Sequence, residues 1–334
     1  MRIQDIGERE LISIIHRLQA RPPLGYIGIG DDAAFIPPNS RGTLISQDML
    51  VENQHFRLDW MTPEQLGEKA VAVNVSDIAA MGGTPQALLT SLSVPGSLDV
   101  AWVESLYRGI AKALDRYGLV LIGGDTVGSR DRITLDVTVV GEPGPSGPML
   151  KTGARPGDRL FVSGRLGASY AGLMLLSHGI TWPSTVVVER SVLMAHLTPT
   201  ARVKVGQQLG PFAHALTDIS DGLVAELEEI TRFGRIGAVI FEDRLPIDDA
   251  TLTTARRYAV QGTDFALYGG EDYELLAAIP PSRVSEVHEL EARTGVVMTE
   301  IGKITETPGV RMAASEGEPE HDLQGRIYNH FPVA

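Results

Sequence analysis

The segment TPEQLGEKAVAVNVSDIAAMGG, residues 62–83, contains the start and stop signals of one long helix. Thr62 is suited to cap the first turn and Pro63 to begin it, while the closing glycines, Gly82 and Gly83, are suited to end it. Apolar runs of strand length occur on both sides of this helix, at residues 43–48, 119–123, 133–140, 159–163, 237–241 and 273–279. Because these runs alternate with helix-like segments, we predict an α/β or α+β fold.

One acidic residue of this helix falls on the face that should be apolar. Steps of four, three, four and three positions place five residues on that face, namely Leu66, Ala70, Val73, Asp77 and Ala80. Asn74 lies one turn before Asp77. A buried carboxylate needs hydrogen-bonding partners or a cation, so Asp77 is either bonded to its neighbours or a metal ligand.

Further acids occur where an apolar run or a glycine turn gives way to a polar segment. They are Asp31 and Asp32 in GIGDDA, Asp48 at the end of LISQD, Asp125 after LVLIGG, and Asp218 and Asp221 in DISDGL. Ligands of α/β folds bind at the carboxyl ends of strands, so we expect these acids to face one site. Carboxylates in contact repel each other by about 4 kcal/mol at intermediate dielectric, so a cation is required. The chain has no cysteine and few histidines at ligand spacing, and Mg²⁺ therefore fits better than zinc.

Length and composition limit the classes of protein that remain. At 334 residues the chain is long enough for two domains. The segment EPGPSGP, residues 142–148, predicts the junction, which gives domains of residues 1–145 and 146–334. A net charge of −13 argues against nucleic acid as a partner. No apolar run is long enough for a membrane span, and the absence of cysteine indicates a reducing cytoplasm.

Two common kinds of site motif do not fit. Counted from Asp218, the stretch DISDGLVAELEE has acids at the first and twelfth positions of a calcium EF-hand loop, but its glycine is fifth where the sixth is required. The chain contains no GxxxxGK[ST] phosphate loop, and GIGDDA lacks the third glycine of a dinucleotide fingerprint. A Walker-type NTPase and a Rossmann dehydrogenase are therefore not supported.

A set of motifs, all in one order, resembles the thiamine-monophosphate kinase family. The motifs are GIGDDAA at 28–34, SQDMLVENQHF at 46–56, KAVAVNVSDIAAMGGTP at 69–85, GGDT at 123–126, DISDGL at 218–223 and GGEDYEL at 269–275. The wider superfamily includes aminoimidazole ribonucleotide synthetase and selenophosphate synthetase, which share the Asp-rich glycine turns but not the whole set. GGEDYEL and the closing YNHF, residues 328–331, favour the thiamine-phosphate branch.

The resemblance implies a homodimer of two-domain chains with the aminoimidazole ribonucleotide synthetase-like fold, in which the N-terminal sheets of two copies pair into a barrel. The N-terminal domain would bind ATP and Mg²⁺ and form the dimer, and the C-terminal domain would complete the thiamine-phosphate and metal site. The implied reaction is direct in-line transfer of the γ-phosphoryl group of ATP to thiamine monophosphate with several Mg²⁺ ions. Because both substrates are anions, an acidic protein needs bridging cations to hold them together.

The same resemblance implies roles for individual residues. The Mg²⁺ ligands would be Asp32, Ser46, Gln47, Asp48, Asp77, Asp125, Asp218 and Asp221, with Asp48, Asp125 and Asp218 as the catalytic candidates. The nucleotide contacts would be Gly124, Asp125, Lys151 and Ser220, and the thiamine-phosphate contacts His55, Glu271 and Tyr328. Gln47 replaces a threonine common in the family. Lys151 stands where the family often has arginine, whose fork orients a phosphate more strictly than a lysine does.

Simpler interpretations stay open on the sequence alone. An aspartate at a turn usually bonds its own backbone, Lys151 fits an exposed linker, His55 a surface loop, and Tyr328 a C-terminal core. Two other classes of protein also remain: another ATP-dependent synthetase of the same superfamily, and a non-catalytic oligomer that binds metal and nucleotide. The acids present in every motif argue for catalysis, because an inactive site need not keep them.

Overall fold

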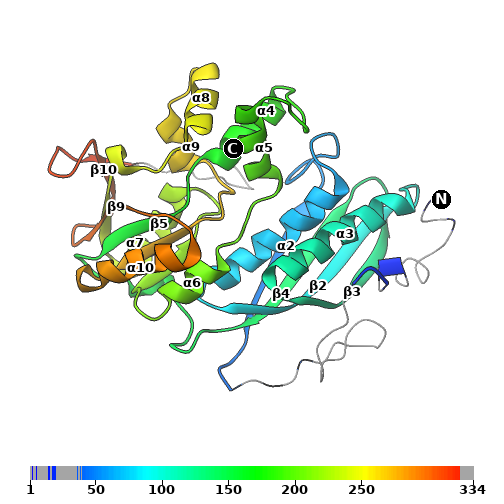
Figure 1. The fold of residues 1–334 in the computed structure, drawn as a ribbon, viewed down its shortest axis with the longest axis horizontal. Helices are drawn as coiled ribbons and strands as arrows, with labels where there is room; N and C mark the ends of the chain where they lie inside the picture. The colour runs from blue at the N-terminus through cyan, green and yellow to red at the C-terminus, as the bar shows by residue number, and fades with distance from the viewer. Residues whose placement is uncertain are drawn as a thin grey trace. The chain divides into compact units, whose positions relative to one another are not determined.

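The computed structural model describes residues 40–323 together with Arg2, Asp5, Ile14, Ile15, Arg17, Leu18, Gln19, Ile36 and Pro38. The chain divides into two compact units, one formed by Met1–Ile78 and Gly83–Pro143 and the other by Ala79–Gly82 and Gly144–Ala334. Each unit combines one sheet with helices (Figure 1), which confirms the predicted mixed α/β class. Among the described residues, no helix has the length and apolar content that crossing a membrane requires.

The first unit contains a four-stranded sheet in the order β1-β4-β2-β3. Its strands are β1 (Leu44–Val51), β2 (Thr84–Pro95), β3 (Val120–Ser129) and β4 (Thr134–Glu142). β4 runs antiparallel to β1 and β2, while β2 and β3 are parallel and are connected through helix α3 (Val100–Tyr117). β1 and β3 are therefore the two edges of this sheet.

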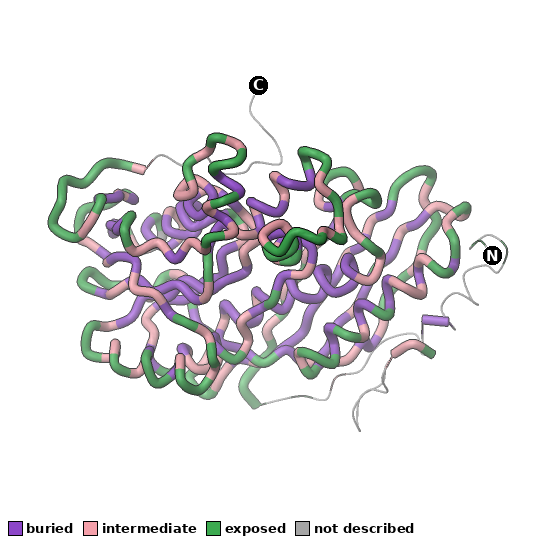
Figure 2. Tube along the Cα trace, turned by 45° about the horizontal axis from the view of Figure 1, so that its top comes forward, coloured by how far each residue is buried: buried purple, intermediate pink, exposed green. Residues whose placement is uncertain are grey.

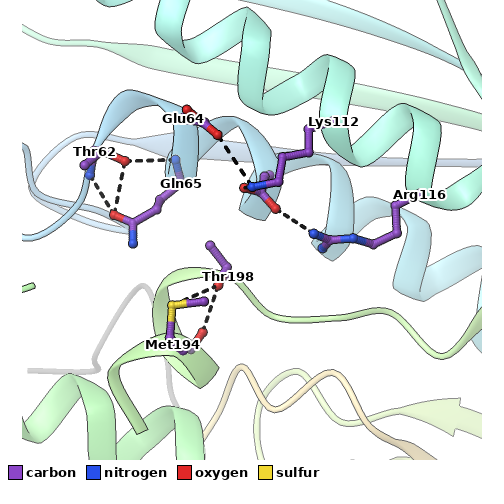
Figure 3. A network of polar contacts seen from close by, with 8 residues as sticks. Thr62, Glu64, Gln65, Lys112, Arg116, Met194 and Thr198 are labelled. Atoms are coloured by element: carbon purple, nitrogen blue, oxygen red, sulfur yellow. Dashed lines mark hydrogen bonds and ion pairs between the residues drawn. The ribbon is translucent and has the colours of Figure 1, made fainter. Parts of the chain in front are cut away.

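Helix α2 (Pro63–Ala80) begins and ends where the sequence predicts. The N–H of Gln65 donates to Thr62 Oγ1 (3.2 Å), and the N–H of Thr62 donates back to Gln65 Oε1 (2.9 Å). Figure 3 shows this reciprocal capping box, which satisfies two N–H groups at the start of the helix. At the other end, Gly82 has a left-handed φ of 65°, and the N–H groups of Gly82 and Gly83 bond carbonyls of the last turn.

Helix α2 is buried on all sides rather than along the single face that its spacing predicts. Every residue from Gln65 to Ala80 is buried except Asp77, which is half-buried. Helix α3 crosses α2 at backbone distance, because a Cβ atom at Gly109 would lie 2.0 Å from the carbonyl oxygen of Glu64. Only glycine fits at this crossing, so α3 packs closely against one side of α2.

One buried carboxylate also joins these two helices. Glu68 of α2 is 4% exposed and accepts hydrogen bonds from Lys112 (2.7 Å) and Arg116 (2.8 Å) of α3. Figure 3 shows Lys112 and Arg116 directed from α3 toward α2, with Glu64 as a further partner of Lys112. Burial of a carboxylate is tolerated when cations surround it in this way.

The second unit contains a seven-stranded sheet in the order β11-β10-β7-β9-β5-β8-β6. Its strands are β5 (Arg159–Ser163), β6 (Ala215–Asp218), β7 (Gly237–Phe241), β8 (Leu275–Ile279), β9 (Met298–Thr305), β10 (Gly309–Ala313) and β11 (His321–Asp322). Neighbouring strands are antiparallel, except that β7 and β10 are parallel. Its helices are α4 (Ala168–Ser177), α5 (Val187–Leu197), α6 (Val203–Leu209), α7 (Leu223–Gly234), α8 (Asp249–Arg257), α9 (Gly262–Tyr268) and α10 (Val284–Thr294), with short 3₁₀ turns at η1 (Lys151–Gly153), η2 (Glu242–Arg244) and η3 (Pro281–Arg283).

Helices cover both faces of this second sheet because its strands alternate between two apolar clusters. Leu160 and Val162 of β5 belong to a cluster that includes Leu227 of α7. Phe161, between them, belongs to a cluster that includes Leu209 of α6 and residues of α10. Figure 2 shows the result along the chain, with buried residues in the strands and in the helix faces packed on them, and exposed residues at many connecting turns.

All six predicted strand segments overlap strands of the structure, and these predictions are confirmed. The strands β2, β9, β10 and β11 have no counterpart among the predictions, and β6 was indicated only by the expected strand end at Asp218. β2 is the most important of them, because it lies inside the first sheet and pairs with both β3 and β4. It contains Pro85 and Pro95, and proline normally argues against a central strand since it cannot donate to the ladder. Here both prolines lie at or next to the strand ends, and the pairing between them continues through one register shift on each side, at Leu88/Leu89 with β3 and at Pro85/Ala87 with β4.

Candidate active site

Two of the candidate residues on β1 face helix α2. Ser46 and Asp48 are two positions apart and therefore point to the same side of the strand. Ser46 Oγ donates to Asp77 Oδ2 (2.5 Å), and the N–H of Asp48 donates to Asn74 Oδ1 (3.0 Å). Asn74 also donates through Nδ2 to the carbonyl of Ala70 (2.9 Å), which fixes its amide. The polar positions of α2 thus meet the polar positions of β1, and the oxygen atoms of both elements gather at one place.

Gln47 points to the other side of β1. Its Nε2 donates to Asp136 Oδ1 on β4 (2.6 Å). Because successive residues of a strand alternate between faces, this side chain lies away from Ser46 and Asp48. A contact between Gln47 and a ligand held by those two residues would have to use its backbone.

Asp125 lies on the same face as Gln47, at the opposite edge of the sheet. The register aligns one residue from each strand in a single row, Met49, Asp136, Ser91 and Asp125. Residues of one row share a face, and Asp48, one position before Met49, lies on the other. Three strand spacings separate β1 from β3, which is roughly 14 Å. Within one chain, the sheet does not bring Asp48 and Asp125 together.

Neither Asp48 nor Asp125 ends its strand, and the prediction of strand ends was wrong for both. β1 continues beyond Asp48, and β3 beyond Asp125, because backbone pairing with β4 and β2 extends past the apolar run. Gly124, just before Asp125, has a φ of 156°, and a Cβ atom there would lie 1.9 Å from the carbonyl oxygen of Thr90. Only glycine fits at position 124, because the backbone of β2 lies so close.

His55 lies in the turn that follows β1. Its Nδ1 accepts the N–H of Val51 (3.0 Å), and its own N–H donates to the carbonyl of Val51 (2.9 Å). A neutral imidazole that accepts at Nδ1 has its proton on Nε2. The turn therefore presents His55 as a hydrogen-bond donor through Nε2.

In the second unit, the motifs DISDGL and GGEDYEL lie side by side. The N–H of Glu271 donates to the carbonyl of Ser220 (2.7 Å), and the N–H of Tyr273 to the carbonyl of Ile219 (2.9 Å). The N–H of Ile219 donates to the carbonyl of Glu274 (2.8 Å). Glu271 and Tyr273 have left-handed φ angles of 65° and 51°, which residues other than glycine rarely adopt. These backbone bonds hold the strained segment against the turn, and strain of this kind is common at functional sites.

The two aspartates of DISDGL differ in burial. Asp218 is the last residue of β6 and is 6% exposed, which confirms its predicted place at a strand end. Asp221 is exposed in the turn that follows, and Ser220 between them is half-buried. The turn therefore offers one carboxylate that is shielded from water and one that is open to it.

A histidine that no sequence motif marks contacts the Glu271 carboxylate. His196 Nδ1 of α5 lies 3.2 Å from Glu271 Oε2 and 3.2 Å from Ser169 Oγ. His196 is 5% exposed, at a helix position that an apolar residue usually occupies. The contact could not be predicted because it joins α5 to a loop far along the chain.

Asp272, next to Glu271, caps helix α4. Its carboxyl oxygens accept the N–H groups of Gly167 (2.7 Å) and Ser169 (3.3 Å). Burial of this carboxyl raises the pKa of Asp272 to about 8; the two N–H bonds oppose the rise, and the charges of Glu274 and Asp248 add to it. The cap links the start of α4, which carries Ser169, to the GGEDYEL segment.

Lys151 is held in place rather than extended into solvent as a linker lysine. Its Nζ donates to Glu226 Oε2 of α7 (2.9 Å), and the side chain of Glu226 is 5% exposed. Burial acts to lower the pKa of Lys151, but Glu226, Asp218 and Glu229 together raise it above its ordinary value. Lys151 therefore remains a cation that a buried carboxylate holds.

Two candidate residues, Asp32 and Tyr328, lie outside the described part of the chain, as does Asp31. Within residues 40–323 and the nine described positions before them, no three histidine, aspartate or glutamate side chains form a group that could hold a metal ion. A metal held by the described residues would therefore combine at most two of these side chains with other oxygen atoms, such as those of a hydroxyl, a backbone carbonyl, water or a bound phosphate.

Comparisons with known proteins identify the family. Residues 30–142 match the N-terminal domain of AIR synthase related protein, and residues 155–314 match its C-terminal domain. Thiamine-monophosphate kinase of Bacillus subtilis (strain 168) is 35% identical over 307 residues, which cover 91% of this chain and 93% of that protein. The chain belongs to the thiamine-monophosphate kinase family.

Solved structures of thiamine-monophosphate kinases share the fold of this chain. The enzyme from Stenotrophomonas maltophilia K279a has a TM-score of 0.82 at 32% identity, covering 92% of this chain and 96% of that one. AaThiL complexed with AMPPCP and TMP has a TM-score of 0.77 at 34% identity, covering 99% of each chain. The predicted resemblance to the thiamine-monophosphate kinase family is thus confirmed, and with it the two-domain AIR synthase-like fold.

Proposed function

We propose that this protein is a kinase that uses ATP to convert thiamine monophosphate to thiamine diphosphate. The observation that carries the proposal is the likeness, at 34% identity over 99% of the chain, to AaThiL complexed with AMPPCP and TMP. That complex pairs an analogue of ATP with the phosphorylated acceptor. A second support is the backbone pairing of DISDGL with GGEDYEL, because it joins residues assigned to metal and nucleotide with one assigned to the acceptor.

The two domains have different roles in the proposed reaction. Residues 1–145 bind ATP and Mg²⁺ and form the dimer, and residues 146–334 complete the thiamine-phosphate and metal site. The polar contacts between β1 and α2 support the first role. The network of Lys151, Glu226 and the DISDGL turn supports the second, since it combines a cation for phosphates with acids for a metal.

Several Mg²⁺ ions are the metal cofactor in this proposal. The donors are all oxygen atoms, which hard cations prefer, and they come from Asp32, Ser46, Gln47, Asp48, Asp77, Asp125, Asp218 and Asp221. Mg²⁺ usually binds through one or two carboxylates together with water and substrate phosphates, which agrees with the lack of a closed three-residue group among the described residues. When bound, the ions neutralise the phosphates and hold donor and acceptor together.

The chain's own residues orient the two substrates. Lys151 balances charge on the nucleotide phosphates, with Gly124 and Ser220 as further nucleotide contacts. His55 donates through Nε2 to the accepting phosphate. Glu271 accepts from an amino group or balances the thiazolium charge, and Tyr328 packs against a ring. Catalysis then depends on orientation and charge.

Phosphoryl transfer is direct in this mechanism, without a phosphoenzyme. The chain has no cysteine. Of the histidines near the candidate residues, His55 accepts a backbone N–H at Nδ1 and His196 is buried against Glu271. Neither imidazole therefore serves as a nucleophile in the proposed mechanism. A covalent intermediate labelled from γ-labelled ATP would contradict this step.

The active form is a homodimer whose N-terminal sheets pair into a barrel. The face of the first sheet that carries Asp125 also carries exposed apolar side chains, Ile45 (68%), Met49 (53%) and Val127 (51%). Exposed apolar groups gathered on one face support an interface. Because Asp48 lies on the other face of the same sheet, we propose that each site combines Asp48 of one copy with Asp125 of the second.

An assay for thiamine diphosphate tests the function. Purified protein is incubated with Mg-ATP and thiamine monophosphate, and the product is separated and quantified; parallel reactions contain EDTA, or thiamine in place of the monophosphate. Product is expected only with the monophosphate and Mg²⁺. The absence of thiamine diphosphate at saturating substrates would overturn the proposal, and would favour another synthetase of the superfamily or a non-catalytic oligomer.

A cytoplasmic location, consistent with the lack of cysteine, completes the proposal.

A further inference from the structure

One buried carboxylate in the second unit collects hydrogen bonds from three segments of the chain. Glu226 of α7 accepts from Lys151 Nζ of η1 (2.9 Å) and from Thr217 Oγ1 of β6 (3.1 Å), both at Oε2. Ser220 Oγ of the DISDGL turn donates to Oε1 (3.4 Å). The side chain of Glu226 is 5% exposed. A carboxylate removed from water requires such partners, and here the partners themselves are held by it.

These partners are the residues around the proposed nucleotide contacts. Lys151 and Ser220 are assigned to the nucleotide, and Thr217 directly precedes the catalytic candidate Asp218. Glu226 therefore contacts both Lys151 and Ser220, which are assigned to the nucleotide, although no role in the site has been assigned to Glu226 itself.

The contact also gives Lys151 a defined orientation. A lysine ammonium is a point charge on a flexible four-carbon stem, and it lacks the rigid fork by which arginine orients a phosphate. The ammonium has three N–H donors, and the bond to Glu226 uses one of them. The side chain of Lys151 is 40% exposed, so it is partly open to a ligand while Glu226 holds its ammonium group.

We propose that Glu226 is a positioning residue for the nucleotide, which holds the Lys151 ammonium so that the ammonium contacts the phosphates of ATP. Glu226 itself touches no substrate and acts through Lys151. The inference rests on the proposed function, because that function assigns Lys151 to the nucleotide. It deepens the proposal by explaining how a lysine, which lacks the rigid fork of arginine, is oriented toward a phosphate.

A double-mutant cycle on nucleotide binding tests the coupling. The dissociation constant of Mg-ATP is measured by calorimetry, without thiamine monophosphate, for the wild type, Lys151→Met, Glu226→Ala and the double variant. Loss of one charge-assisted contact is expected to weaken binding about tenfold in Lys151→Met. Glu226→Ala is expected to weaken it by a similar factor, because the lysine loses its orientation. The double variant should bind no more weakly than either single variant.

A conservative variant and a matched control separate positioning from stability. Glu226→Gln keeps the shape and an oxygen acceptor for Lys151, so its binding should lie between those of the wild type and Glu226→Ala. Glu226→Gln also replaces Glu226→Ala in the double-mutant cycle if Glu226→Ala does not fold. The control is Glu68→Ala, which removes a carboxylate that is equally buried, at 5% side-chain exposure, and that also pairs with cations. Glu68→Ala should lower the melting temperature without changing the affinity for Mg-ATP.

The outcomes distinguish this inference from the proposed function. Additive losses in the double variant, or equal or tighter binding in Glu226→Ala, would overturn the inference, because Glu226 would then act independently of Lys151 or compete with phosphate for the ammonium. A wild type that binds Mg-ATP but makes no thiamine diphosphate would overturn the proposed acceptor. The double-mutant cycle on Mg-ATP binding could still be interpreted in that case. A wild type that binds no nucleotide would overturn both.

Discussion

Asp48 and Asp125 lie on opposite faces and opposite edges of the same four-stranded sheet. Asp48 shares its face with Ser46, which bonds Asp77 of α2, whereas Asp125 shares its face with Gln47 and the exposed Met49. The proposed reaction uses both aspartates. The proposed dimer would bring Asp48 of one copy to Asp125 of the second, and the exposed apolar side chains on the face of Asp125 support that arrangement.

Neutral replacements of these two aspartates are expected to abolish turnover without unfolding the protein. Asp48→Asn and Asp125→Asn each remove a charge that is proposed to bind metal. Neither residue supports an apolar core, since Asp48 is half-buried and Asp125 exposed. Activity is measured with Mg-ATP and thiamine monophosphate, and folding by circular dichroism and gel filtration. Near-normal activity in either variant, or unfolding of both, would count against a metal-binding role.

Mixing the two inactive variants tests whether the copies share a site. After subunit exchange, half of the dimers are mixed, and each mixed dimer has one site with both aspartates intact. Activity should then recover to about one quarter of the wild-type value. A mixture that stays inactive, despite exchange confirmed with a tagged subunit, would show that each chain builds its site alone.

Replacement of Glu271 is expected to affect one substrate only. Glu271→Gln should raise the KM for thiamine monophosphate and leave the KM for ATP nearly unchanged, because Glu271 is assigned to the organic part of the acceptor. Tyr328→Ala should have the same effect on the two KM values. Steady-state kinetics with each substrate varied in turn decides the matter. Glu189→Gln, which removes a carboxylate that pairs with Arg257 on the same unit, serves as the control. An equal loss for both substrates would mean that the acceptor site lies elsewhere.

The cap formed by Asp272 predicts a particular pH dependence of stability. Its pKa is raised from 3.8 to about 8 in the folded protein. Between these values the folded state keeps a proton that the unfolded chain has lost, so the contribution of Asp272 to the free energy of unfolding is complete at low pH and disappears by about pH 8, with a slope of at most about 1.4 kcal/mol per pH unit. Asp272→Asn does not titrate. The free energy of unfolding of the wild type should therefore fall relative to that of Asp272→Asn as the pH rises from about 5 to about 8; parallel curves would contradict the prediction.

The crossing of α2 and α3 predicts a large loss of stability at one glycine. Gly109→Ala would place a Cβ atom 2.0 Å from the carbonyl oxygen of Glu64, so the helices must separate. A loss of about 2–4 kcal/mol in the free energy of unfolding is expected, measured in urea. Gly128→Ala is the matched control, because no atom lies within 4 Å of a Cβ atom built there. Equal stability of the two variants would show that the crossing is looser than described.

Local features of this protein could be predicted from the sequence because their causes act over a few residues. The start of α2 depends on the exchange of hydrogen bonds between Thr62 and Gln65, and its end on the glycine pair. Asp77 stood out as a polar position on that helix, and in the structure it receives a bond from Ser46. The motifs likewise identified the family, because they are contiguous stretches that can be compared directly.

Only the tertiary structure decided which of these groups meet. Asp48 and Gln47 are neighbours in sequence, yet they lie on opposite faces of β1, and Asp125 proved to share the face of Gln47. No motif indicated that Glu226 would hold Lys151, 75 residues earlier in the chain. Such contacts depend on strand register and helix packing, which are set by many distant partners at once, and a shift of register by one residue would move a side chain to the other face.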